Sequence, residues 1–200
     1  MRYINYLDYP AIPSNLEQEI LDTVQKQAIH FEANDLLVNT SKEMQDVLGI
    51  TNYDSNTNIG YHYSQAKVYF PNLVNYYFLE PSDNVKDWVV KNINSLATIN
   101  IQVMSNGTCI PPHVDEVRTT AINYILQTGG AVHTDFFHVK DSFNHLDVTS
   151  QTAIPHERLT LMESCILQPS RWHSLDVRQI HSVENIDPKQ KRIALTLSIV

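Results

Sequence analysis

The sequence predicts a mostly β protein with helices near its N-terminus, and three observations lead to this prediction. From about residue 96 the apolar residues alternate with a period of two, which is typical of β-strands. Short β-rich runs follow one another in this region, and such spacing indicates a sandwich or a barrel. Before residue 96 the apolar residues recur with a helical period. We expect one domain over 1–200, with a helical and irregular support region at 1–95 and a β core at 96–200.

Helices are predicted in the support region. The first of them has Ser14 followed three positions later by Glu17, which is the pattern of a capping box. In the first and last of these helices the apolar residues fall on one stripe, so the helices are available to cover a sheet. The expected helices are 14–28, 41–48 and 82–93.

The strands of the β core are predicted from runs of alternating or β-branched residues. They are expected at 97–104, 119–127, 131–139, 158–168, 173–177 and 192–200. The two most regular runs each have a large apolar face and a small or polar face. Asn123 lies on the polar face of the earlier run, and Arg192 and Thr196 lie on the polar face of the last one. A sheet that packs its apolar face on helices and turns its polar face into a barrel would need this pattern.

The composition excludes several classes of partner. With 14 Lys and Arg against 22 Asp and Glu, the net charge is −8, which is the wrong sign for a surface that binds nucleic-acid phosphates. No apolar run is long enough for a membrane helix, and the N-terminus lacks the pattern of a secretory signal. Cys109 and Cys165 form no CxxC pair, so no thiolate zinc site is encoded. We expect no nucleic-acid or membrane partner and a location in the reducing cytoplasm.

Histidine is abundant, at 9 residues, and some of these residues occur in a pattern that suggests a metal site. His113 and Asp115 are two residues apart at an expected strand end, so both side chains can point to one side. His181 precedes a β-run that begins at Arg192. Two histidines and one carboxylate form a facial triad, which leaves coordination positions of Fe(II) open. Arg192 would then serve as a clamp for a carboxylate, because its planar fork suits a two-point contact.

These residues also carry a family resemblance, which covers roughly 98–200. The stretches NGTCIPPHVDEVR and HSVENIDPKQKRIALTLSI resemble Fe(II)- and 2-oxoglutarate-dependent dioxygenases of the prolyl-4-hydroxylase-like type. The resemblance implies a double-stranded β-helix, or jelly-roll, core covered by helices on one face. It implies that Fe(II), the cosubstrate 2-oxoglutarate and dioxygen are used. Relatives often carry a tyrosine on the strand before the HxD motif. In this sequence the corresponding position is close to Val103, and the tyrosine is missing.

The resemblance also implies a role for each candidate site residue. The metal ligands, which are also the catalytic residues, map onto His113, Asp115 and His181. The arginine that binds the far carboxylate of 2-oxoglutarate maps onto Arg192. A further contact to 2-oxoglutarate is expected from the polar faces of the strands, where Asn123 and Thr196 are the candidates.

The expected activity is hydroxylation of an unactivated C–H bond of a peptidyl residue, with release of succinate and carbon dioxide. A free amino acid or another small metabolite is the alternative substrate. A cupin-type metal-binding protein that does not use 2-oxoglutarate, a zinc hydrolase and an inactive binding module are the alternative classes. Arg192 speaks against the cupin-type class, and the absence of an HExxH motif speaks against a zinc hydrolase. The oligomeric state stays open.

Three other residue groups compete for roles in the site. A second HxD motif joins His133 to Asp135, but using it would leave too few strands to close the barrel. His173 is an alternative distal ligand, although no arginine follows it at the spacing of the family. Arg118 is interpreted either as a structural ion-pair partner or as a substrate contact.

Overall fold

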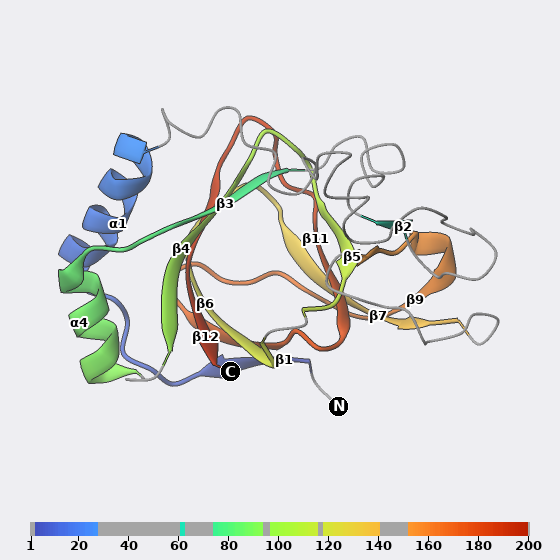
Figure 1. Cartoon of the computed structure of the whole chain (residues 1–200), viewed down its shortest axis with the longest axis horizontal. Coiled ribbons are helices and arrows are strands. Elements are labelled where there is room, and N and C mark those ends of the chain that lie inside the picture. Colours follow the sequence, from blue (N-terminus) through green and yellow to red (C-terminus); the bar gives the residue numbers. More distant parts are fainter. Residues whose placement is uncertain are drawn as a thin grey trace, which may run out of the picture.

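Two antiparallel β-sheets, with two helices against one of them, form the computed structural model of the chain (Figure 1). The structure describes residues 3–27, 61–62, 74–93, 97–115, 118–140 and 152–199. The helix expected at 41–48 therefore lies outside the described residues. The mostly β fold class is confirmed, because the described part of the chain has many more strands than helices.

The larger sheet has six strands and the smaller one has four. In spatial order, the six are β1 (Ile4–Leu7), β10 (Trp172–Asp176), β6 (Thr120–Thr128), β12 (Arg192–Ile199), β4 (Thr98–Ser105) and β3 (Asn75–Leu79). The four are β5 (Ile110–His113), β11 (Ile180–Glu184), β7 (His133–Val139) and β9 (Leu159–Cys165). A separate pair joins β2 (Tyr61–His62) to β8 (Thr152–Ala153), and a short 3-10 helix spans His156–Arg158.

The strand order is that of a jelly roll. From β4 to β7 each successive strand lies in the other sheet, and the same alternation holds from β9 to β12. Strands β4, β12, β6 and β10 form one layer and β5, β11, β7 and β9 form the other, all with antiparallel pairing. This arrangement is the double-stranded β-helix. Strands β1 and β3 extend the larger sheet at its two edges.

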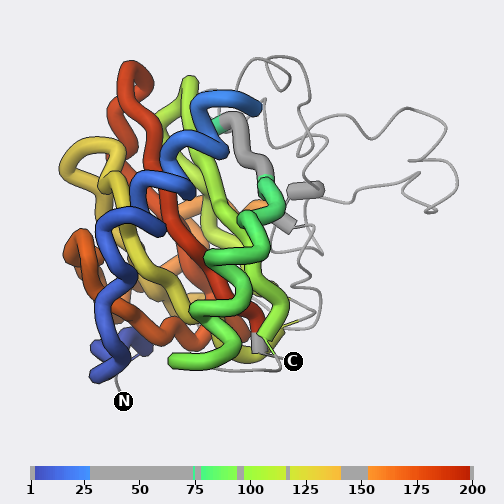
Figure 2. Tube along the Cα trace, turned by 90° about the vertical axis from the view of Figure 1, so that its left-hand side faces the viewer, coloured from blue at the N-terminus to red at the C-terminus, as the bar shows by residue number. Residues whose placement is uncertain are grey.

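The helices α1 (Ser14–Gln27) and α4 (Asp83–Asn92) lie against the outer face of the six-stranded sheet (Figure 2). Their apolar stripes belong to one buried cluster with side chains of β4, β6 and β12, among them Ile20, Val89 and Leu195. The Ser82 hydroxyl caps α4 by accepting a hydrogen bond from the Val85 N–H at 3.4 Å. The expected ends of both helices are close to those observed.

The capping box predicted for the first helix is not what the structure shows. The helix begins at Ser14 itself, and the carbonyl of Pro13 accepts hydrogen bonds from the first helical N–H groups. The Glu17 carboxylate instead accepts a hydrogen bond from the Tyr124 hydroxyl at 2.6 Å. Glu17 therefore joins the helix to β6, a long-range contact that a local sequence pattern does not reveal.

The alternating faces of β6 and β12 separate two environments. Tyr124 and Leu195, from the large apolar faces, pack in the cluster under the helices. Ala121 and Ala194, from the small faces, pack between the two sheets with Phe136 of β7. The small faces therefore point toward the interior of the barrel, which is where the sequence pattern predicts a polar site.

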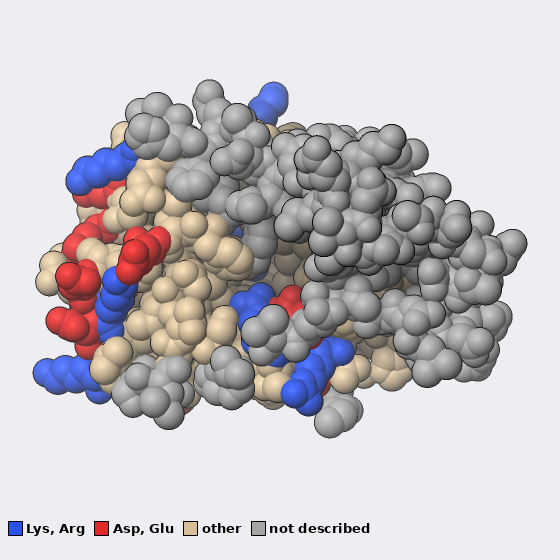
Figure 3. All heavy atoms as spheres, viewed as in Figure 1, with Lys and Arg blue, Asp and Glu red and all other residues tan. Residues whose placement is uncertain are grey.

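The outer surface of the helices carries acidic and basic side chains side by side (Figure 3). Lys86, for example, pairs with Glu80 at 2.6 Å. Within the described part of the chain, no helix is both long and apolar enough to cross a membrane.

All six predicted runs contain a strand, but four strands of the two sheets are not predicted. Two of these, β5 and β11, carry the two candidate metal-binding histidines. Strand β5 contains Pro111 and Pro112, which lack an N–H group and normally argue against a strand. The two prolines are tolerated because β5 is an edge strand, which pairs with β11 on one side only. The segment directly after His181 is the rest of β11.

Candidate metal centre

The structure brings the two candidate histidines together across a pair of neighbouring strands. His113, the last residue of β5, is the register partner of His181 in β11. Their ring centroids are 4.4 Å apart. Asp115 lies two residues beyond the end of β5, and its backbone N–H donates a hydrogen bond to the Val177 carbonyl at 2.9 Å. One ligand atom from each of the three side chains lies within 4.8 Å of the other two, which is close enough for a single ion.

Hydrogen bonds to backbone carbonyls fix the tautomer of both rings. The Nδ1 atom of His113 lies 2.8 Å from the Pro111 carbonyl, and that of His181 lies 2.9 Å from the Gln179 carbonyl. Because a carbonyl only accepts, each Nδ1 must carry the proton and donate. The Nε2 nitrogen is then the metal-binding atom of each ring. Metal-ligating histidines characteristically donate their other N–H group in this way.

The electrostatic environment keeps two of the side chains in the forms that bind metals. Burial, and to a smaller extent the nearby His113, lower the pKa of His181 to about 3, although the charge of Asp115 acts in the opposite direction. For Asp115, burial opposes ionisation, but the hydrogen bond with His113 and the charge of Arg118 outweigh it and lower its pKa well below the usual range. At neutral pH His181 is therefore neutral and Asp115 is ionised, as metal coordination requires.

Arg192 lines the same small cavity as the two histidines. The cavity has a volume of about 40 Å³, and its lining includes His113, His181, Asn123 and Arg192. Arg192 is only 3% exposed, and its Nη1 donates to the Met104 sulfur at 3.7 Å, which is a weak acceptor. The planar guanidinium presents donors that match a carboxylate in two-point contact, so an anionic ligand suits this cavity.

The two further candidates on the polar faces have different surroundings. Asn123 lines the cavity, and its buried Oδ1 has no hydrogen-bond partner among the described residues. Such an orphaned polar atom is suited to a ligand or a water. Thr196 is fully buried, and its hydroxyl oxygen lies 3.5 Å from Nη1 of Arg118. The described lining of the cavity does not include Thr196.

Sequence reasoning missed two lining residues of β4. Gln102 and Met104 line the cavity, whereas Val103 packs in the cluster under the helices. Val103 therefore faces away from the site, and a tyrosine at that position would not reach the cavity. The strict alternation of residues along β4 was the signal that could have found Gln102 and Met104.

Arg118 is also part of the site. Its Nε donates a hydrogen bond to Oδ2 of Asp115 at 2.5 Å, and both side chains are 17% exposed. Arg118 lines the cavity as well. Of the two interpretations from the sequence, the ion pair is therefore present in the structure, and its partner is a candidate metal ligand.

The competing histidines have other surroundings. His133 pairs with Asp135 through Nδ1 and Oδ1 at 3.0 Å. In the register of β7 and β11, Asp135 lies opposite Ser182 and therefore on the other face of the sheet from His181. The Nε2 atom of His173 accepts a hydrogen bond from the Gln168 N–H at 3.2 Å. None of these three side chains belongs to the metal-binding group found among the described residues.

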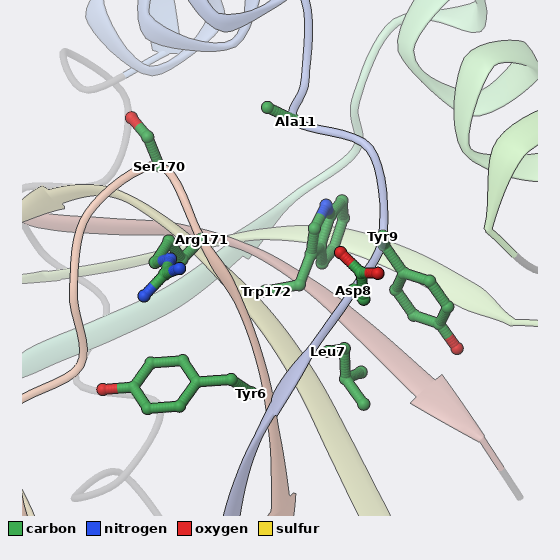
Figure 4. A pocket seen from close by; sticks show the side chains of 8 residues that line it. All are labelled: Tyr6, Leu7, Asp8, Tyr9, Ala11, Ser170, Arg171 and Trp172. Atoms are coloured by element: carbon green, nitrogen blue, oxygen red, sulfur yellow. The ribbon is translucent and has the colours of Figure 1, made fainter.

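A larger cavity of about 330 Å³ lies elsewhere, between the segment after β1 and the start of β10 (Figure 4). Two of its lining residues, Arg171 and Tyr6, contact each other: the guanidinium carbon lies 5.3 Å from the centroid of the tyrosine ring. The residues that line it are Tyr6, Leu7, Asp8, Tyr9, Ala11, Ser170, Arg171 and Trp172. No candidate site residue is among them.

No model of a known protein family matches the sequence, and no curated protein matches it. Among solved structures, a cupin superfamily protein from Desulfitobacterium hafniense is 13% identical over 64% of this chain and 79% of that one, with a TM-score of 0.31. A recombinant oxalate oxidase in complex with glycolate is 17% identical over 64% of this chain, with a TM-score of 0.36. This chain covers 52% of that oxidase. The jelly-roll fold stands on the strand order and pairing described above.

Proposed function

We propose that the protein is an Fe(II)- and 2-oxoglutarate-dependent oxygenase that hydroxylates a C–H bond of a peptidyl residue and releases succinate and carbon dioxide. One observation carries the proposal: the group formed by His113, Asp115 and His181 lies at a cavity that also contains the buried guanidinium of Arg192. A metal site alone would not need such a cation. A metal site that works with a carboxylate cosubstrate would.

The donor set fits Fe(II). Two neutral imidazoles and one carboxylate are the ligands of the facial triad, and they leave other coordination positions open. His113 and His181 would bind through Nε2, since their Nδ1 atoms donate to backbone carbonyls. When bound, Fe(II) would supply the activation of dioxygen and the redox chemistry. The chain itself would hold the ligands, orient the cosubstrate and keep bulk water out.

The cavity fits 2-oxoglutarate in charge. Arg192 would bind the far carboxylate with a charge-assisted hydrogen bond, and the Asn123 amide would offer a neutral contact. In volume the cavity is small: at about 40 Å³ it holds a few water molecules. A five-carbon dicarboxylate therefore requires lining side chains to move apart.

The small volume also supports a second candidate function. A cupin-type metal-binding protein that does not use 2-oxoglutarate would need room only for a small ligand, and the cavity of about 40 Å³ meets that need. Arg192 would then bind a small anion. The first candidate is preferred because the HxD motif, His181 and Arg192 all match the pattern of the dioxygenase family.

The substrate class is proposed from the prolyl-4-hydroxylase-like resemblance over 98–200. A peptidyl residue is the leading substrate, and a free amino acid or a small metabolite is the alternative. A screen of short peptides and free amino acids, with succinate as the common product, would separate these substrates.

Succinate formation tests the proposed function. The metal-free protein would be supplied with Fe(II) and 2-oxoglutarate in air, with His181→Ala as a variant without the metal site. We expect succinate from the wild type, increased by a true substrate, and none from the variant. If the protein binds metal but forms no succinate with any of the substrates, the cupin-type function would be favoured.

A further inference from the structure

The two carboxylate oxygens of Asp115 face different partners. Oδ1 lies 3.5 Å from Nε2 of His113, on the side of the metal-binding group. Oδ2 accepts the hydrogen bond from Nε of Arg118 at 2.5 Å. One oxygen is therefore directed toward the candidate metal position and the other is occupied by a guanidinium.

Arg118 is itself attached to the barrel. Its Nη1 lies 3.5 Å from the hydroxyl of Thr196, which is fully buried on β12 in the middle of the larger sheet. The side chains of Arg118 and Asp115 are each only 17% exposed. An ion pair that is largely withdrawn from water and anchored at a second point restricts the carboxylate far more than a surface pair does.

We propose that Arg118 is a positioning residue that limits Asp115 to one metal-binding oxygen. A carboxylate with both oxygens available can chelate an ion through two bonds. With Oδ2 held by Arg118, only Oδ1 is left for the metal. The inference rests on the proposed metal site, but not on the use of 2-oxoglutarate.

The consequence concerns the number of open coordination positions. Two histidines and a one-oxygen carboxylate occupy half of an octahedron, so a two-point ligand and one further small ligand can both bind. If Asp115 chelated the metal, it would occupy one of those positions. Arg118 would thus preserve the position that a chelating ligand needs.

Arginine and lysine differ in this role. The guanidinium presents donors at fixed positions, so Nε can bind Asp115 while Nη1 reaches Thr196. An ammonium group keeps the positive charge but cannot reproduce both contacts. The variant Arg118→Lys therefore separates the position of the donor from the charge near Asp115.

Cobalt(II) spectroscopy tests the proposal without any turnover. The metal-free wild type, Arg118→Gln and Arg118→Lys would be titrated with Co(II), whose visible absorption depends on its coordination number and geometry. Oxalate, which can bind through two oxygens, would then be titrated into each Co(II) protein. Arg178→Gln is the matched control, because Arg178 is exposed and outside the site.

We expect both Arg118 variants to bind Co(II) with an altered visible spectrum and to lose affinity for oxalate by roughly tenfold. The Arg178 control should match the wild type. Identical spectra and oxalate affinities in the wild type and Arg118→Lys would overturn the proposal while leaving the metal site intact. A wild type that binds no Co(II) would overturn the metal site and the proposal together. If Arg118→Gln fails to fold, Arg118→Lys decides.

Discussion

The imidazole rings of His113 and His181 meet across the pairing of β5 with β11, with their centroids 4.4 Å apart. The edge strand β5 brings one ring into place, and the inner strand β11 brings the other. Asp115 completes the group because the backbone after β5 is tied to Val177. The site therefore depends on the pairing of two strands that are distant in the sequence.

Removing a metal ligand should abolish tight metal binding. For His181→Ala and for Asp115→Ala we expect Co(II) or Fe(II) affinity to fall by more than about a hundredfold, because loss of even an outer-shell partner commonly costs 10–100-fold. Isothermal titration calorimetry of the metal-free proteins would measure this loss. His133→Ala, from the second HxD motif, should bind metal as the wild type does. Equal losses in all three variants would contradict the assignment of the ligands.

Replacing Arg192 with alanine should weaken 2-oxoglutarate and spare the metal. A hydrogen bond to a charged group contributes about 1.5–3 kcal/mol, so we expect affinity to fall roughly ten- to hundredfold. Equilibrium titration of the metal-loaded protein with 2-oxoglutarate would measure this. Arg178→Ala controls for the loss of a surface charge. Unchanged 2-oxoglutarate affinity in Arg192→Ala would refute the clamp.

A methyl group at Gly129 should displace Arg192. Gly129 has a φ of +73°, and an added Cβ would lie 2.8 Å from the Cβ of Arg192. We expect Gly129→Ala to lower the free energy of unfolding by about 1–2 kcal/mol, as a left-handed conformation costs an alanine, and to weaken 2-oxoglutarate binding. Urea unfolding and ligand titration would measure the two effects.

Gly130 provides the control for this prediction. Its φ is +110°, but an added Cβ would approach Asp187 at 3.1 Å instead of Arg192. Gly130→Ala should therefore destabilise the fold while leaving the affinity for 2-oxoglutarate close to that of the wild type. Equal loss of 2-oxoglutarate affinity in both variants would contradict a specific effect of Gly129 on Arg192.

The thiol of Cys109 should react slowly with alkylating agents. Burial, together with the negative charge of Glu184, raises the pKa of Cys109 to about 11. Since the thiolate is the reactive form, its fraction at pH 8 is roughly a hundredfold below that of an ordinary cysteine. In a Cys165→Ser background, iodoacetamide labelling should be slow when the protein is folded, accelerate as the pH rises toward 11 and be fast in urea. Rapid labelling of the folded protein at pH 8 would contradict this environment.

The strand content and the inward faces could be predicted from the sequence because they are local properties. Alternation along β6 and β12 placed Asn123 and Arg192 on one face, and both line the cavity. The pattern of side chains in a strand repeats every two residues, so a single strand carries that information.

The unpredicted features depend on contacts between distant segments. Strand β5 contains two prolines and exists because β11 pairs with it at the sheet edge. The contact of Arg118 with Thr196 requires β12 to pair with β6, which begins just after Arg118. Glu17 reaches Tyr124 instead of capping its helix for the same reason. No local pattern encodes which distant strand or side chain becomes the neighbour.

An anaerobic titration of the metal-free protein with Fe(II) and then with 2-oxoglutarate tests the central claim most directly. Chelation of Fe(II) by 2-oxoglutarate produces a visible absorption band, so the titration reports both ligands in one sample. The account predicts a band in the wild type that requires far more 2-oxoglutarate in Arg192→Ala. Iron binding with no band at any 2-oxoglutarate concentration would contradict it.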